Sequence, residues 1–441
     1  MENFSSLSLG EKVRLLRHAK SISQSNMALA IKSNQSYVHR LESGQATCSA
    51  DMLAAIKKFL EIEDVPLMEH ELMIYWDKIW IWNDQINANR LDDARATHLA
   101  LSPIKQLPFE KNLYMLYSLL EIALTIKSAN LAESVARLSS LQHLLTGASN
   151  EVLFVYNRTC GHLHLMSGDY KASIQHYQKA SEIECRDVKP DAAFFANLGV
   201  AYMNIGKPNY ATQYLERGHQ ESLQGDRSHP VRAHSTSMLA TAYVNIGEYK
   251  KAEKLFNMAL ASARSVGDEK IMILTLSNYS VLKIKMGDYE EGLRLCNQAF
   301  ATDLSQDFSS SMTLINDKYG NALLLTLLYN KALGFLKMKA FDRCKEILDY
   351  GFSIVQGNNK FAIGFESLKH RMTLHENESI EYLETKAIPY FRHGDGLDTF
   401  VALDICNDME AYFKKKKLKI KTFTIVGIIR DIYDTMFFGE I

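Results

Sequence analysis

The residues best suited to chemistry lie in the stretch NQSYVHRLESGQ, residues 34–45. At helical spacing Val38 and Leu41 turn inward, which leaves four polar side chains outside: Gln35, Ser36, His39 and Arg40. Glutamine can pair with adenine edges and arginine with guanine edges. Residues 9–45 hold six basic and two acidic side chains, a local charge of about +4, although the chain's formal net charge is -1. The stretch is either a helix that reads nucleic acid or an ordinary helix of a neutral protein.

Four short helices would position this stretch. Apolar periodicity predicts helices over residues 9–19, 24–31, 35–43 and 50–60, with Ser23, Asn34 and Ser49 as N-caps and Gly44 as the left-handed C-terminal residue. The first helix buries an apolar stripe and directs three cations elsewhere: Lys12, Arg14 and Arg17. The second turns Met27 and Ala30 inward, and Ala28 is small enough for a close crossing with the third. Four such helices can just close a core.

Residues 21–44, SISQSNMALAIKSNQSYVHRLESG, resemble the helix-turn-helix of the Xre/Cro family of bacterial and phage repressors. The resemblance covers about the first 65 residues and implies DNA binding. It implies that Gln35, Ser36 and Arg40 reach base edges, and that four residues contact phosphates: Arg17, Gln24, Asn34 and Tyr37. His39 fits either class or solvent. The family usually has glycine where Lys32 stands and an apolar residue where Ser33 stands; a left-handed non-glycine residue costs on the order of 1 kcal/mol.

The composition of the 441 residues favours a mostly helical protein, with 47% hydrophobic residues and only 7 prolines. The six cysteines are scattered without a CxxC pair, which matches neither a zinc cluster nor a disulfide framework and predicts reduced, mostly buried thiols.

Neither a signal sequence nor a long apolar run occurs, so we expect a cytoplasmic protein with no membrane partner. Common catalytic motifs are missing, so we expect no enzyme activity, no cofactor and no metal.

A phrase beginning with glycine repeats along the remaining chain, at Gly168, Gly206, Gly247 and Gly287. Successive glycines are 38, 41 and 40 residues apart, and each follows a segment of helical length. The unit resembles the tetratricopeptide repeat, whose signature residues here are Leu198, Gly199, Tyr202, Gly206 and Ala211. A degenerate unit lies at 329–352, and further helix pairs lacking the motif glycine are expected at 71–103, 109–146 and 361–394. One repeat cannot bury its apolar face, so a stack is required.

The resemblance implies an all-α fold: a four- to five-helix helix-turn-helix domain over residues 1–65, then a right-handed superhelix over residues 66–441. The superhelix would contain about eight or nine hairpins and end in capping helices over 397–440, with a linker at 61–67. Such arrays usually hold a peptide in a groove lined by the first helix of each pair. With the motif glycine counted as position 15, positions 6 and 13 carry five asparagines: Asn197, Asn204, Asn245, Asn278 and Asn330.

An asparagine amide can bind both N–H and C=O of an extended peptide, and Arg158 at position 5 could meet a carboxylate. Asparagines also end helices, which is an equally good explanation for Asn204 and Asn245 just before Gly206 and Gly247. Trp76, Trp80 and Trp82 lie in the first hairpin, where core packing is a better explanation than a partner surface.

The combination resembles the peptide-pheromone regulators of Gram-positive bacteria and their phages, the group of Rap, Rgg, NprR, PlcR and PrgX, and is most like the NprR branch. The resemblance implies a transcriptional regulator with three partners: a double-stranded DNA operator, a short signalling oligopeptide that switches its activity, and further copies of itself in a homodimer or tetramer. The alternative is a Rap-like adapter that binds a response-regulator protein through the repeats. The peptide, the operator and the direction of the switch are not encoded in these patterns.

Overall fold

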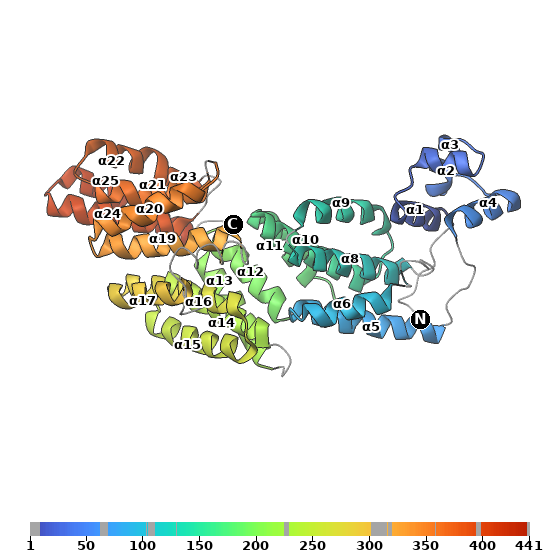
Figure 1. Cartoon of the computed structure of the whole chain (residues 1–441), viewed down its shortest axis with the longest axis horizontal. Helices are drawn as coiled ribbons and strands as arrows, with labels where there is room; N and C mark the ends of the chain where they lie inside the picture. Colours follow the sequence, from blue (N-terminus) through green and yellow to red (C-terminus); the bar gives the residue numbers. More distant parts are fainter. Residues whose placement is uncertain are drawn as a thin grey trace. The chain divides into compact units, whose positions relative to one another are not determined.

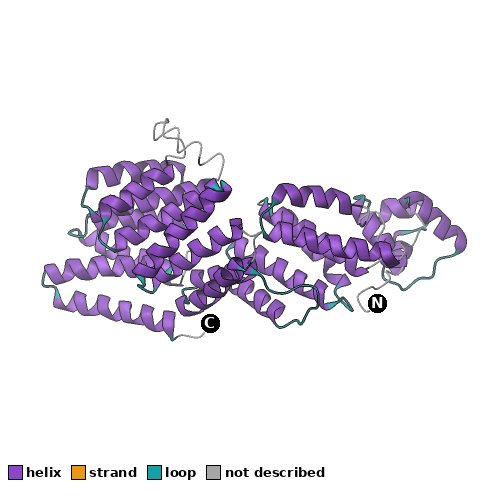
Figure 2. Ribbon diagram, turned by 90° about the horizontal axis from the view of Figure 1, so that it is seen from below, coloured by secondary structure: helices purple, strands orange, loops and turns teal. Residues whose placement is uncertain are grey.

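The computed structural model describes residues 9–61, 69–102, 104, 111–128, 130–224, 229–300, 315, 320–357, 359–393 and 398–438. Within these residues every regular element is a helix (Figure 2). The all-α prediction is therefore confirmed. The chain packs as two compact units, Met1–Pro190 and Asp191–Ile441. The predicted boundary at residue 65 and most of the predicted linker fall outside the described residues, so this division into domains stays a prediction.

The first unit begins with four short helices (Figure 1): α1 (Leu9–Ala19), α2 (Gln24–Ala30), α3 (Gln35–Glu42) and α4 (Ala50–Leu60). Side chains of Ser23, Asn34 and Ser49 accept hydrogen bonds from backbone N–H groups in the first turns of α2, α3 and α4, which confirms the three predicted N-caps. Their common core contains Val13, Leu16, Met27, Ala28, Ile31, Val38, Leu41, Ile56 and Leu60. We call α1–α4 the N-terminal cluster.

Two expectations about this cluster are corrected. Ala30 is exposed, and Ile31, the residue after the end of α2, is buried in its place. Arg17 does not face away from the core: its side chain is only 7% exposed.

Three helical hairpins complete the first unit. They are α5 (Glu69–Asn87) with α6 (Leu91–Leu101), α8 (Lys111–Lys127) with α9 (Leu131–Leu141) and its short extension η1 (Gln142–Leu144), and α10 (Asn150–Ser167) with α11 (Tyr170–Ser181). Trp76 and Trp82 are buried and Trp80 is half-buried, in agreement with the packing role predicted for them. Trp76 Nε1 donates to Asp187 Oδ2 over 3.0 Å, which ties α5 to the chain after α11.

Paired helices also build the second unit. They are α12 (Ala192–Asn204) with α13 (Pro208–Leu223), α14 (His229–Asn245) with α15 (Tyr249–Val266), α16 (Glu269–Lys285) with α17 (Tyr289–Phe300), and α19 (Asn321–Lys337) with α20 (Phe341–Ile354). The C-terminal elements are α21 (Lys360–Met372), α22 (Asn377–Tyr382), the π-helical turn η2 (Leu383–Ala387), α23 (Ile388–His393), α24 (Thr399–Lys415) and α25 (Lys419–Phe437). The helix pairs predicted at 71–103, 109–146 and 361–394 are present among the described residues.

The glycines of the repeat motif adopt the backbone conformations and close contacts that only glycine permits without strain. Gly168, Gly206, Gly247 and Gly287 all have positive φ between 73° and 85°, the left-handed conformation that ends the first helix of each pair. Gly199 lies against Leu215: an added Cβ would come within 2.5 Å of Leu215 Cγ, so only glycine permits this crossing. In the degenerate unit Lys339 takes the turn position with φ of 61°, which explains why no glycine marks that repeat in the sequence.

The C-terminal pair α24–α25 returns to the first hairpin of the second unit. Lys207, between α12 and α13, donates from Nζ to the carbonyl oxygen of Thr435 in α25 over 2.8 Å. The neighbouring Gly206 lies against Thr399 at the start of α24, where an added Cβ would approach Oγ1 to 2.4 Å. The capping role predicted for residues 397–440 therefore includes a contact back to the beginning of this unit.

The structure also bears on cysteines and membranes. All six cysteines are free thiols, and Cys160, Cys296, Cys344 and Cys406 are buried, as predicted. In the described part of the chain, none of the helices combines the length and apolar character that a membrane crossing needs.

Candidate functional site

The outer face of α3 is the first candidate site. Gln35, Ser36, His39 and Arg40 are all exposed, as predicted, while Val38 and Leu41 fix the opposite face in the core. The helix starts sharply because Asn34 Oδ1 accepts a hydrogen bond from Tyr37 N over 2.8 Å. Before it, Lys32 adopts φ of 54°, the conformation expected where the resembled family has glycine. Gly44 ends the helix with φ of 72°. We call the four exposed residues the α3 face.

A buried ion pair holds this face in orientation. Arg17 of α1 donates from Nε and Nη2 to Glu42 of α3 over 2.6 and 2.9 Å, and from Nη1 to the carbonyl oxygen of Ile22 over 2.7 Å. Gln24 of α2 donates to the same carboxylate over 2.8 Å. Burial opposes ionisation of Glu42, but the hydrogen bonds from Arg17 and Gln24 keep the pKa of this carboxyl below its usual value. One carboxylate thus connects three helices.

These contacts revise the four predicted phosphate contacts. Arg17 uses its guanidinium inside the cluster, so it positions α3 and does not face a ligand. Gln24 and Tyr37 are half-buried, and the Tyr37 hydroxyl donates to the carbonyl oxygen of Thr47 over 3.3 Å. Asn34 is exposed and caps α3. The α3 face is therefore the part of the prediction that remains available to a partner.

The predicted peptide-binding asparagines divide into two groups. Asn197 of α12, Asn245 of α14 and Asn278 of α16 are half-buried on the first helices of their hairpins. Asn204 is half-buried too, but its amide donates to the carbonyl oxygen of Val200 in its own helix over 2.8 Å, the helix-end role that was the alternative. Asn330 is only 6% exposed, and its amide donates to Ser277 Oγ over 2.9 Å. Asn330 therefore connects α19 to α16. The prediction that it lines a peptide-binding groove is corrected, because its side chain lies in the interior.

Arg158 is also an interior residue. Its side chain is buried in α10, and Nη2 donates to Asn83 Oδ1 of α5 over 2.6 Å. The predicted role as a carboxylate partner is therefore not supported by its position.

A charged cluster in the second unit was missed by the sequence analysis. Arg371 of α21 and Lys337 of α19 both bind two carboxylates of α24, Asp404 and Asp408. The N–O distances are 2.5 Å from Arg371 to each, and 3.2 and 2.6 Å from Lys337 to Asp404 and Asp408. Burial works against the charge on Asp404, yet the two cations lower its pKa to about 2. We call these four residues the α24 ion cluster.

One signal for this cluster was present in the sequence. When Gly287 is counted as position 15, Lys285 occupies position 13. Lys339 takes the same left-handed turn conformation, and when it is counted as position 15, Lys337 occupies position 13. Only the asparagines at that position were predicted to bind a ligand. The acidic partners lie one helical turn apart on α24, a spacing that places Asp404 and Asp408 on one face, but the sequence does not say which cations they meet.

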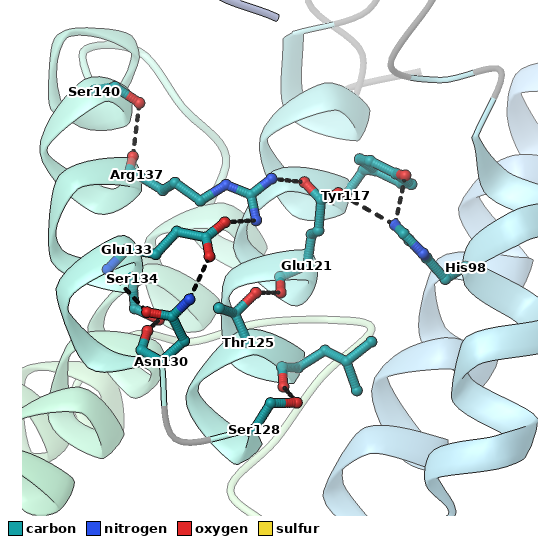
Figure 3. A network of polar contacts seen from close by, with 11 residues as sticks. His98, Tyr117, Glu121, Thr125, Ser128, Asn130, Glu133, Ser134, Arg137 and Ser140 are labelled. Atoms are coloured by element: carbon teal, nitrogen blue, oxygen red, sulfur yellow. Dashed lines mark hydrogen bonds and ion pairs between the residues drawn. The ribbon is translucent and has the colours of Figure 1, made fainter.

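A second polar network lies in the first unit, shown in Figure 3. Glu121 of α8 pairs with Arg137 of α9 over 2.5 Å and lies 3.3 Å from Nε2 of His98 in α6 (Figure 3). The Tyr117 hydroxyl lies 2.8 Å from the same nitrogen. Trp82 stacks on His98. On the outside of the same hairpins, Met73, Ile74 and Ile81 of α5 and Leu99 of α6 are exposed. We call these four residues the α5–α6 apolar patch.

Comparisons with known proteins identify the repeat and the fold. A tetratricopeptide repeat model matches residues 235–270, which run from within α14 through α15 to the start of α16. No curated protein matches the chain. Among solved structures, a Rap protein complexed with competence and sporulation factor is 16% identical, with a TM-score of 0.64 over 82% of this chain and 98% of that one. The apo quorum sensor NprR from B. thuringiensis is 16% identical, with a TM-score of 0.61 over 83% and 100% of the two chains.

A third structure, aspartyl phosphate phosphatase F from Bacillus subtilis, is 18% identical, with a TM-score of 0.51 over 84% of this chain and 96% of that chain. At these identities the likeness establishes a common fold, the superhelix of tetratricopeptide-like hairpins seen in Rap and NprR structures. The expected absence of enzyme activity stays a prediction.

Proposed function

We propose that this chain is a transcriptional regulator that binds double-stranded DNA through α3 and is switched by a short signalling peptide bound to its repeat region. The observation that carries the DNA half is the α3 face, four exposed polar side chains held outward by the buried Arg17–Glu42 pair. Gln35 and Arg40 have the donors and acceptors that distinguish adenine and guanine in the major groove. A helix of this kind inserts its N-terminal end into the groove.

The peptide half is supported by the fold. Two structures that share it hold a bound factor or peptide by their own descriptions: a Rap protein complexed with competence and sporulation factor, and NprR in complex with its cognate peptide NprX. In this chain Asn197, Asn245 and Asn278 are half-buried on the first helices of three successive hairpins. Their amides can pair with the backbone of an extended peptide whatever its side chains. The protein would act in the cytoplasm, where DNA and a reimported peptide meet.

The switch we propose is a shift between two arrangements of a homodimer or tetramer. A peptide that binds one arrangement more tightly favours it. If the two α3 faces then match half-sites about 34 Å apart, or a multiple of this distance, DNA affinity changes. The coupling is reciprocal, so operator DNA must change peptide affinity by the same factor.

A gel-shift experiment on the DNA flanking the chain's own gene tests the proposal. The full chain should shift this DNA, and short peptides encoded directly downstream should change the apparent affinity. Arg40→Ala should weaken the shift, whereas Lys58→Ala, which removes an exposed cation from α4, should not. If neither variant differs from the unmodified chain, and no peptide has an effect, the proposal is wrong.

The α5–α6 apolar patch favours a second candidate, an adapter that binds a response-regulator protein. Four large apolar side chains are exposed on this one hairpin, and exposed apolar surface is typical of protein contacts. The phosphatase from Bacillus subtilis shares the fold, so the fold is compatible with a different output. Ile81→Asp in the full chain should abolish capture of a response regulator from solution while leaving the DNA shift intact. Unchanged capture would exclude this surface.

A further inference from the structure

The turn between α24 and α25 carries a dense group of positive charges. Lysine occupies six of the eight positions in residues 414–421, and all eight residues are exposed. Residues 411–430 contain no aspartate or glutamate. Lys414 pairs with Glu410 over 2.7 Å. Four other lysines form no ion pair with any residue that the structure describes: Lys415, Lys416, Lys417 and Lys419. A chain with a formal net charge of only -1 thus concentrates cations at one point of its surface.

Large apolar side chains stand among these cations. Ile420 is 83% exposed, Phe423 is 79% exposed and Leu418 is 41% exposed. Ile420 and Phe423 lie three residues apart, so they share one face of α25. The opposite face holds the helix in place through Ile425, which is buried in the core of the C-terminal elements. We call the following residues the α24–α25 tip: Lys415, Lys416, Lys417, Leu418, Lys419, Ile420, Lys421 and Phe423.

Local preferences of the chain explain only part of this tip. Lys415 lies in the last turn of α24, where the helix dipole favours cations. Lys419 and Lys421 lie in the first turn of α25, where the dipole disfavours them. Lys417 adopts φ of 58°, the conformation for which four other hairpins use glycine without strain. Exposed isoleucine and phenylalanine are unfavourable in water as well. A partner that is both negatively charged and apolar would offset these costs.

We propose that the α24–α25 tip binds the surface of an anionic lipid membrane. Ile420 and Phe423 insert at the boundary between headgroups and acyl chains, and the lysines lie among the phosphates of the headgroups. A helix that is apolar on one side and rich in lysine around it is typical of such binding. Groups of about four to eight basic residues are typical of sites for anionic lipids. The expectation of no membrane partner followed from the lack of a long apolar run, which a surface-bound helix does not need.

Two other partners match the tip less well. DNA phosphates would attract the lysines, but a phosphate backbone does not bury an isoleucine or a phenylalanine side chain. A second copy of the chain placed tip to tip would bring like charges together. An anionic membrane is the partner that provides both negative charge and an apolar layer. This binding goes beyond the proposed function and depends on neither DNA nor peptide.

Sedimentation of lipid vesicles with the full chain tests the proposal. One set of vesicles contains phosphatidylcholine alone, and the other contains equal amounts of phosphatidylcholine and phosphatidylglycerol. We expect the partition coefficient to be at least about tenfold higher for the anionic vesicles, since each lysine contributes about fivefold. Phe423→Ser should lower it by about tenfold, because an apolar side chain no longer leaves water. Lys419→Gln should lower it by about fivefold.

A further variant and two controls separate binding from folding. Lys417→Gly removes one cation and relieves the strained turn, so vesicle binding should fall by about fivefold while the melting temperature does not fall. The controls are on α15, which carries an exposed apolar residue and an exposed cation far from the tip in sequence: Met258→Ser and Lys254→Gln. Both controls should bind vesicles like the unmodified chain.

Three outcomes would overturn the proposal. The first is that the unmodified chain does not bind the anionic vesicles, or that Phe423→Ser binds them as Met258→Ser does. The second is that Lys419→Gln alone weakens binding and that DNA of random sequence displaces the chain from the vesicles, which would assign the tip to nucleic acid. The third is an oligomer that Phe423→Ser dissociates, in a chain that does not bind vesicles, which would assign the tip to a second copy. Each of these outcomes leaves the proposed binding of operator and peptide untouched.

Discussion

The N-terminal cluster and the α24 ion cluster each bury an arginine against carboxylates, but the two arrangements leave different surfaces. In the first, Arg17 binds Glu42 and leaves Arg40 exposed on the α3 face. In the second, Arg371 and Lys337 share Asp404 and Asp408, and Lys285 remains without an ion pair among the described residues. In both regions buried cations pair with carboxylates, whereas another cation forms no ion pair among the described residues. Residue type alone therefore does not identify which cations stabilise the fold; their partners do.

The largest effect should come from the α24 ion cluster. Arg371 has a side chain that is 0% exposed, so Arg371→Met leaves two carboxylates with Lys337 alone. We expect a loss of about 3 kcal/mol in the free energy of unfolding of the second unit, because removing the buried arginine leaves two half-buried carboxylates with a single cation. Urea denaturation followed by circular dichroism measures it. Lys285→Met is the control and should change stability less, since Lys285 forms no ion pair with any residue that the structure describes. Similar losses for both variants would contradict the division of roles between these cations.

The Arg17–Glu42 pair should show the second largest effect. Arg17→Met should cost the N-terminal cluster about 3 kcal/mol, and adding Glu42→Leu should restore much of it, because a buried pair can be replaced by apolar packing. The pKa of Glu42 is lowered from the usual 4.5, so the pair's contribution is complete above pH 4.5 and is lost as pH falls through the lower value of the folded state. Amide hydrogen exchange in α1 and α3 reports on this local stability. A double variant less stable than Arg17→Met would contradict the explanation.

Substitutions on the α3 face should change the affinity for DNA and leave the stability of the protein unchanged. Arg40→Ala should weaken operator binding by roughly ten- to a hundredfold, which corresponds to about 1–3 kcal/mol for one bidentate base contact. The measurement is a titration of labelled operator at fixed salt, since phosphate contacts depend strongly on salt. Lys58→Ala provides a control of equal charge on α4. Equal weakening by both variants would indicate general electrostatic attraction and not base recognition.

The sequence was sufficient to predict most features of the fold that depend on interactions between neighbouring residues. The caps at Ser23, Asn34 and Ser49 and the left-handed glycines require only neighbouring residues, and they are confirmed. Arg17 was misplaced, although a signal existed: Arg17 follows Val13 by four residues and Glu42 follows Val38 by four, so each charge lies on the buried stripe of its helix. Opposite charges on two buried stripes indicate an internal pair.

Positions in the repeats were less predictable because their environment depends on distant helices. Position 6 is half-buried at Asn278 and interior at Asn330, where Ser277 of another helix receives the amide. The difference between Lys285 and Lys337 likewise depends on where α24 returns, and no periodicity within the repeats contains this information. The sequence therefore identified the helices that carry the candidate site better than the residues that form it.

The turn before α3 should show the smallest effect, and it tests whether the N-terminal cluster tolerates strain to present its face. Lys32 has φ of 54°, a conformation that costs a side-chain-bearing residue about 1 kcal/mol and glycine almost nothing. Lys32→Gly should therefore raise the stability of the cluster by at most about 1 kcal/mol, because glycine also gains entropy in the unfolded chain. Lys58→Gly, a matched change inside α4, should lower stability by about 1 kcal/mol. Thermal unfolding of the two variants should shift in opposite directions; a fall in both would mean that Lys32 contributes contacts worth more than the strain of its backbone.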